Sequence, residues 1–143
     1  MKTPIDSIVR VHSWKLDEAQ QKLADLESLG IKLEQDIEKL DAEVAKEQEF
    51  ASQHPDMAQT YPAYAEAARE RRKRLETSIE EVITLKAIAQ QELHEIYQDL
   101  KKYEEAQAND IKRQQDVLKK KEQAAFDEMG IQQYRRRKAS ENN

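Results

Sequence analysis

Three histidines, His12, His54 and His94, are the side chains in this sequence best suited to bind a transition metal or carry a proton. The run His94-Glu95-Ile96-Tyr97-Gln98 begins like the motif of zinc peptidases, in which two histidines four residues apart share one helix face. Gln98 stands where the second histidine is required, so this run cannot form that site. The chain has no cysteine, which excludes disulfides, thiolate nucleophiles and cysteine-ligated metals. The sequence therefore predicts no metal site and no cofactor.

Catalysis by other routes finds no support either. A phosphate-binding loop needs several glycines close together, and the two glycines here, Gly30 and Gly130, are far apart. Aspartate and glutamate are numerous, but an acid and base pair needs a cleft that shields it from water. A chain that folds without a cleft leaves these carboxylates solvated. We expect no enzymatic activity.

The amino-acid composition limits the fold classes that this chain can adopt. Charged side chains make up 37% of the 143 residues and hydrophobic ones 38%, which suffices for a narrow apolar seam but not for a wide core. Two glycines and three prolines leave few turns, so strands are not expected. The abundant Ala, Glu, Lys, Leu and Gln favour long helices. This composition is typical of coiled coils.

Charge and hydropathy also exclude some partners. The net charge of -5 would repel phosphate, so nucleic acid is not an expected partner. No window resembles a signal peptide or the ~20 apolar residues that span a bilayer, so no direct membrane insertion is expected. We predict a soluble, cytoplasmic protein.

A heptad pattern runs through the first third of the chain. Alternating steps of three and four from Val9 to Ala51 meet an apolar residue at 10 of 13 positions, which predicts a left-handed coiled-coil seam. Thr3, Pro4 and Asp6 resemble the start of a helix, with a capping box and proline in the first turn. The first helix should begin near Pro4.

A second seam follows a break at residues 52 to 62, which contain two prolines. From Tyr61 to Tyr103 the same steps meet 11 apolar residues among 13 positions. Because the connection is short, we expect the two seams to pack against each other antiparallel. With the turn centred near residues 57 and 58, Leu33 would face Val82.

The predicted fold is all-α: a long antiparallel two-helix coiled-coil hairpin with unequal arms. We expect one domain over residues 1–143, with helix one at about 4–52, a turn at about 53–61, helix two at about 62–137 and a basic tail at 138–143. Helix one would be ~70 Å long and helix two ~110 Å. In this register, the chain beyond Asp110 has no intramolecular partner.

This uncovered end of helix two carries apolar residues that a solvated tail has no reason to keep, and exposed apolar stripes commonly mark contact sites. Either the tail folds back or frays, or a second protein covers it. The candidate partner-binding residues combine this stripe with the basic end: Ile111, Leu118, Phe126, Met129, Ile131, Tyr134, Arg135, Arg136 and Arg137.

A second basic run, from Arg69 to Arg74, follows the turn. It is either a solvated face or a docking point for an acidic partner. Trp14 and Tyr103 are expected to pack beside the seam near the open end of the hairpin.

Two short motifs add a resemblance. With Leu100-Lys101-Lys102-Tyr103-Glu104 late in helix two and Phe126-Asp127-Glu128-Met129-Gly130-Ile131 before the basic end, the chain resembles the flagellar export protein FliJ family over essentially its whole length. The resemblance implies a cytoplasmic component of the flagellar type III protein export apparatus, held peripherally at the membrane through that apparatus. It also implies a role in flagellum biogenesis and motility.

The resemblance further implies three kinds of partner. The open end of the hairpin, residues 5–20 and 100–137, would enter and stimulate a hexameric flagellar export ATPase, as the stalk of a rotary ATPase does. The faces near the turn would meet the cytoplasmic domain of the export gate membrane protein, although no gate-contacting residues can be recognised. Export chaperones are a third expected partner.

The main alternative is a structural or adaptor coiled coil without an ATPase partner. In that case the uncovered ends of two copies would pair with each other.

Overall fold

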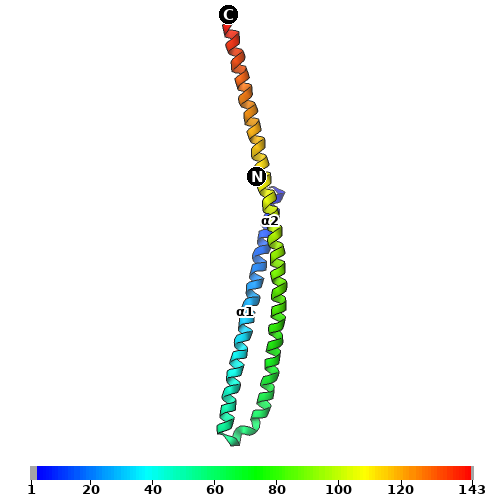
Figure 1. Ribbon diagram of the computed structural model, residues 1–143, viewed down its shortest axis with the longest axis vertical. Coiled ribbons are helices and arrows are strands. Elements are labelled where there is room, and N and C mark those ends of the chain that lie inside the picture. Colours follow the sequence, from blue (N-terminus) through cyan, green and yellow to red (C-terminus); the bar gives the residue numbers. More distant parts are fainter. Residues whose placement is uncertain (1–2, 143) are drawn as a thin grey trace. The chain divides into compact units, whose positions relative to one another are not determined.

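Two long helices joined by a short 3-10 helix make up the computed structural model, which describes residues 3–142 (Figure 1). Helix α1 spans Pro4–Gln53, the 3-10 helix Pro55–Thr60, and α2 Tyr61–Glu141. Within the described residues there is no strand, and the two helices pack against each other. The predicted all-α hairpin is confirmed, and its helices are unequal, with 50 and 81 residues.

The start of α1 is a reciprocal cap. The backbone N–H of Thr3 donates to Asp6 Oδ2 at 2.8 Å, and the N–H of Asp6 donates to Thr3 Oγ1 at 3.3 Å. These bonds satisfy two of the donors that the first turn of a helix leaves open. Pro4 lacks an N–H and therefore fits the first helical position.

The helix ends differ from the expected ones by a few residues. α1 continues through Gln53, and the prolines do not open a loop, because Pro55 fits the first turn of the 3-10 helix. α2 extends to Glu141, beyond the expected end at residue 137, and so includes most of the expected basic tail. Basic side chains in the last turns favour helix because they complement the negative end of the helix dipole.

The chain divides into two compact units. The central unit, His12–Gln98, contains the turn and the parts of α1 and α2 that lie side by side (Figure 1). Lys22 Nζ lies 3.5 Å from Glu92 Oε2, and Arg72 Nε lies 3.0 Å from Asp41 Oδ1. Residue numbers rise on α1 as they fall on α2 in these pairs, so the helices run antiparallel.

The seam residues form the core of this unit. Every predicted seam position on α1 except Glu47, and every one on α2, is half-buried or buried. The fully buried ones in the central unit are Leu40, Ala68, Val82 and Ala89. Alanine at two of these positions lets the helices approach closely, and burial of each leucine or valine stabilises the pair by about 1.5–3 kcal/mol.

The register differs from the expected one by less than a helical turn. A Cβ atom placed on Gly30 would lie 3.6 Å from Val82 Cγ1, so Val82 lies against Gly30, whereas Leu33 was expected there. The expectation assumed a symmetric loop, but the turn is made of a regular 3-10 helix that follows a longer α1. The alignment of the two helices depends on this detail.

The terminal unit comprises Met1–Val11 and Asp99–Asn143. Its packed part is short: Leu100 is buried, and Gln107 Nε2 donates to Asp6 Oδ1 at 2.6 Å. From Ile111 to Asn142 every residue is exposed. We call residues 111–142 the C-terminal segment.

Candidate functional site

The C-terminal segment exposes large apolar side chains along a regular helix. Leu118 is 57% exposed, Phe126 67% and Met129 51%. Such exposure is unfavourable for each group, since removing it from water would stabilise the molecule by about 1.5–3 kcal/mol. The exposed apolar residues of this segment are Ile111, Val117, Leu118, Phe126, Met129, Ile131 and Tyr134.

These side chains do not share a single face. Ile111, Leu118 and Met129 follow one another at intervals of seven and eleven residues, so they project from one side of the helix. Val117 and Ile131 are also a multiple of seven apart and project from another side. A single partner helix needs only one stripe, whereas a partner that surrounds the segment would contact both.

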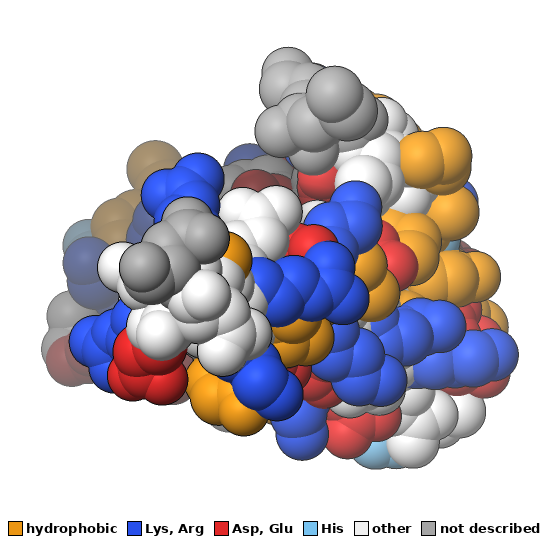
Figure 2. Space-filling model, turned by 90° about the horizontal axis from the view of Figure 1, so that it is seen from above, with side chains coloured by type: hydrophobic (Ala, Val, Ile, Leu, Met, Phe, Trp, Pro, Cys, Tyr) orange, Lys and Arg blue, Asp and Glu red, His pale blue; other side chains and the backbone are white. Residues whose placement is uncertain are grey.

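The segment is also basic. Residues 111–142 contain nine lysines and arginines against five acidic residues. Viewed toward this end of α2, the surface in Figure 2 shows hydrophobic side chains between lysine and arginine side chains. The side-chain contacts seen here join residues four apart, such as Gln123 with Asp127 and Lys138 with the ring of Tyr134. The predicted residues Arg135, Arg136 and Arg137 are exposed.

Two charged residues interrupt the seam of α2, and both reach an acidic residue on α1. Arg72 binds Asp41 through two bonds, Nε to Oδ1 at 3.0 Å and Nη2 to Oδ2 at 3.2 Å, and also contacts Glu76. Lys86 Nζ lies 4.0 Å from Glu27. The hydrogen bond from Arg72 lowers the pKa of Asp41. Such charged pairs help to specify one register over others.

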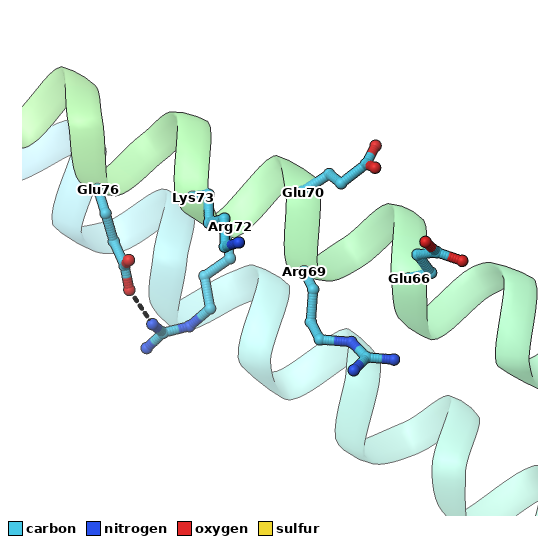
Figure 3. A pocket seen from close by; sticks show the side chains of 6 residues that line it. All are labelled: Glu66, Arg69, Glu70, Arg72, Lys73 and Glu76. Carbon is cyan, nitrogen blue, oxygen red and sulfur yellow. Dashed lines mark hydrogen bonds and ion pairs between the residues drawn. The ribbon is translucent and has the colours of Figure 1, made fainter.

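The basic run after the turn does not form one positive face. Figure 3 shows Arg72 turned toward Glu76, with Arg69 pointing away from it and with Glu66 and Glu70 on the same stretch of helix. Arg69 Nε donates to the carbonyl of Ala65 at 3.3 Å. Because the charges alternate in sign around this shallow surface, it offers no concentrated field for an anion.

The turn end of the central unit has a concave surface with aromatic walls. Phe50 stacks on His54 with ring centroids 4.2 Å apart, and Met57 is 61% exposed. Tyr61 and Tyr64 line the same concavity. The pKa of Tyr64 is raised, mainly because burial disfavours the charged phenolate and next because the negative charges of Glu47 and Glu43 repel it. An exposed methionine and phenylalanine beside polar tyrosines suit contact with another protein.

The histidines do not come together. His12 is half-buried, His54 Nδ1 lies 3.1 Å from the carbonyl of Phe50, and His94 lies beside Leu93 and Tyr97. Across residues 3–142, no group of three His, Cys, Asp or Glu side chains is placed to hold a metal. Nor does any helix there combine the length and apolarity that crossing a bilayer requires.

Sequence reasoning missed a set of apolar residues at the edge of the central unit. Leu29, Leu85 and Ile88 are about half exposed. They flank the seam instead of lying on it, so a search for seam positions passes over them. No pattern in the sequence marks them, because the pairing of Lys22 with Glu92 that defines this edge is seen only in the structure. Of the two aromatic residues expected beside the seam, Trp14 is 60% exposed, whereas Tyr103 is half-buried.

The fold and the exposed segment together define a coiled-coil hairpin protein with an uncovered helical end. The comparisons with known proteins specify the family. The family model described as flagellar FliJ protein matches residues 1–139, so the chain belongs to the flagellar FliJ family. Comparison with curated proteins and with solved structures gave no match. Membership makes the chain a coiled-coil, cytoplasmic component of the flagellar export apparatus, in a family of non-catalytic components.

Proposed function

We propose that the C-terminal segment is the part of this protein that binds the hexameric flagellar export ATPase and stimulates it. The single observation that carries the proposal is that every residue from Ile111 to Asn142 is exposed while the segment keeps large apolar residues. Because these project from more than one side of the helix, they suit a binding site that encircles the segment, such as the central opening of a ring. Family membership supports an export-apparatus partner.

The ATPase proposal assigns separate roles to the two kinds of residue. Leu118, Phe126 and Met129 would supply the apolar contacts that hold the segment in place. Arg135, Arg136 and Arg137 would steer association with an acidic surface and make its rate depend on salt. Ile111 would extend the contact made by Leu118 and Met129, whereas Ile131 and Tyr134 would contact the ring on the remaining sides.

Replacing the apolar contacts tests this proposal. The triple variant L118S/F126S/M129S should keep its helical content by circular dichroism, because these side chains are exposed. It should lose binding to the cognate export ATPase and stimulation of ATP hydrolysis by at least about a hundredfold, since hot-spot side chains cost about 2 kcal/mol or more each.

A matched control replaces exposed apolar residues elsewhere, I31S/I83S in the central unit. This variant should stimulate the ATPase as the natural protein does. Equal stimulation by the two variants and the natural protein would contradict the proposal. A fall in both variants would mean that stability, and not the C-terminal segment, limits the activity.

We further propose that the turn end of the central unit contacts the cytoplasmic domain of the export gate, which links the ATPase to the gate. The support is the concave surface with exposed Phe50 and Met57. The variant F50S/M57S should lower affinity for the isolated gate domain about tenfold or more and leave ATPase stimulation unchanged. Unchanged gate affinity would reject this surface.

The alternative of a structural coiled coil without an ATPase partner predicts that the uncovered segments of two copies pair. In that case, the triple variant above would dissociate a dimer without changing ATP hydrolysis.

A further inference from the structure

The edge of the central unit carries apolar residues that a two-helix coiled coil does not need. Lys22 on α1 pairs with Glu92 on α2 across this edge. Leu29 lies seven residues after Lys22, and Leu85 lies seven before Glu92, so both occupy the same edge one heptad further on. Ile88 lies three residues after Leu85, on the same side of α2 but one position farther from the seam. We call Leu29, Leu85 and Ile88 the edge strip.

Apolar residues beside a seam usually indicate a third helix. Two helices bury only the seam positions of each heptad, and a third helix packs into the groove that the flanking positions border. All three residues of the edge strip are about half exposed, so the groove is open in the single chain. Its occupant should therefore be an amphipathic helix.

The charge around the edge strip indicates what kind of helix fits. On α1 the rows beside Leu29 carry both signs, with Lys22, Lys32 and Lys39 against Asp25 and Asp36, whereas on α2 Glu92 shares the row of Leu85. Glu81 and Glu95 lie seven residues to either side of Ile88, on the same row of α2, and both are exposed. The matching helix should be basic along the side of its apolar stripe that faces α2.

The chain itself contains a helix with these properties. The C-terminal segment has nine basic residues against five acidic ones, and Leu118 and Met129 project from one side of it. At 1.5 Å per residue it is ~48 Å long, which is ample for several heptads of contact. The central unit, by contrast, has 11 basic residues against 19 acidic ones.

We propose that the C-terminal segment of a second copy occupies the edge strip, so that free chains associate reversibly as a dimer in which each copy covers the other. A reciprocal arrangement uses both segments and closes the assembly. The contact hides the residues assigned to ATPase binding, so association and ATPase binding exclude each other. The self-association itself does not depend on the proposed ATPase function, because it is measured with the protein alone.

Sedimentation velocity over a concentration series tests the proposal with the full chain. A dimer should form at low salt and dissociate as salt rises, because the contact joins opposite charges. Two charge-reversal variants, E81K/E95K on the edge and R135E/R136E/R137E on the segment, should each weaken the dimer about tenfold or more. An equimolar mixture of the two should restore the dimer, because in a mixed pair each edge meets a segment of opposite charge, and a chain carrying all five changes should restore it as well.

Failure of the five-fold variant to recover would overturn the pairing of these two surfaces. L85S/I88S should also weaken the dimer, whereas the exposed turn variant M57S should leave it unchanged. A chain that stays monomeric at every concentration and salt tested would reject the proposal outright, without bearing on ATPase stimulation.

Cross-linking identifies which surfaces touch. The chain has no cysteine, so L85C and M129C each introduce a single thiol. Mixing the two variants under mild oxidation should yield a disulfide-linked dimer of one copy of each. Linkage of M129C to M129C alone would instead show that two C-terminal segments pair, and linkage of neither would mean that another protein is the occupant of the edge strip.

Discussion

The two parts of α2 differ in what their apolar residues do. Between Tyr61 and Tyr103, apolar residues recur on one face at heptad spacing and are buried against α1, with only Arg72 and Lys86 as charged exceptions. Beyond Asp110, residues of the same types are spread over several sides, and all are exposed. A continuous helix can therefore carry two different surfaces, one that completes the fold and one that is left for another molecule.

Hydrogen exchange should separate the two parts most strongly. Amides from 61 to 103 are protected by packing, whereas those of the C-terminal segment depend on helix formation alone, which is marginal for isolated helices. At low protein concentration and high salt, where the proposed dimer is dissociated, we expect exchange in the segment to be at least about a hundredfold faster, equivalent to about 2.8 kcal/mol. Mass spectrometry of peptic fragments measures this. Equal protection in the protein alone would mean that the segment is covered.

Truncation of one leucine in each part should give the next largest contrast. Leu40 is 5% exposed and packs against α2. Leu40→Ala should lower the free energy of unfolding by about 2–5 kcal/mol, because it leaves a cavity in the seam. Leu118→Ala should change stability by less than about 0.5 kcal/mol. Urea denaturation of the two variants provides the comparison. A large loss from Leu118→Ala would place that residue in a core.

The two glycines offer a smaller, stabilising contrast. Gly30→Ala should raise the free energy of unfolding by about 1 kcal/mol, since alanine favours helix and its Cβ would make ordinary contact with Val82 at 3.6 Å. Gly130→Ala meets no neighbour within 4 Å and should stabilise helix only locally. Equal shifts of the urea midpoint would indicate that both parts unfold as one cooperative unit.

Acid should have the smallest effect, and it should act on the paired part. The hydrogen bond from the Thr3 N–H, and then that from Gln107, lower the pKa of Asp6, while Arg72 lowers that of Asp41. A lowered folded-state pKa stabilises the fold above the unfolded value of 3.8, and this contribution is lost as pH falls through the folded value. The temperature at the midpoint of thermal unfolding should therefore decrease as the pH is lowered below about 4. The D6N/D41N variant should show a flatter profile.

The seams could be predicted from sequence because a repeat of 3.5 residues identifies buried positions directly. The register could not, because it depends on the 3-10 conformation of Pro55–Thr60, which no periodicity encodes. For the same reason the acidic partners of Arg72 and Lys86 were not evident. The structure continues α2 to Glu141, four residues beyond the expected end at residue 137.

The candidate site was only partly accessible from sequence. The surplus length of α2 identified residues beyond Asp110 as uncovered, and the apolar content of that stretch could be read directly. The edge strip was not found, because Leu29 and Leu85 lie beside the seam and acquire meaning only when the antiparallel pairing brings them to one edge. Flanking positions are informative only after the register is known.

The cap at the start of α1 has a consequence for the length of the exposed helix. Asp6 belongs to that cap and also accepts a hydrogen bond from Gln107, so the first turn of α1 fixes how far along α2 coverage reaches. Insertion of one heptad near the beginning of α1 would cover another ~10 Å of α2, and deletion of one would bare the same distance. Evolution could thus adjust the reach of the binding end by changing the shorter helix and leaving the binding residues untouched.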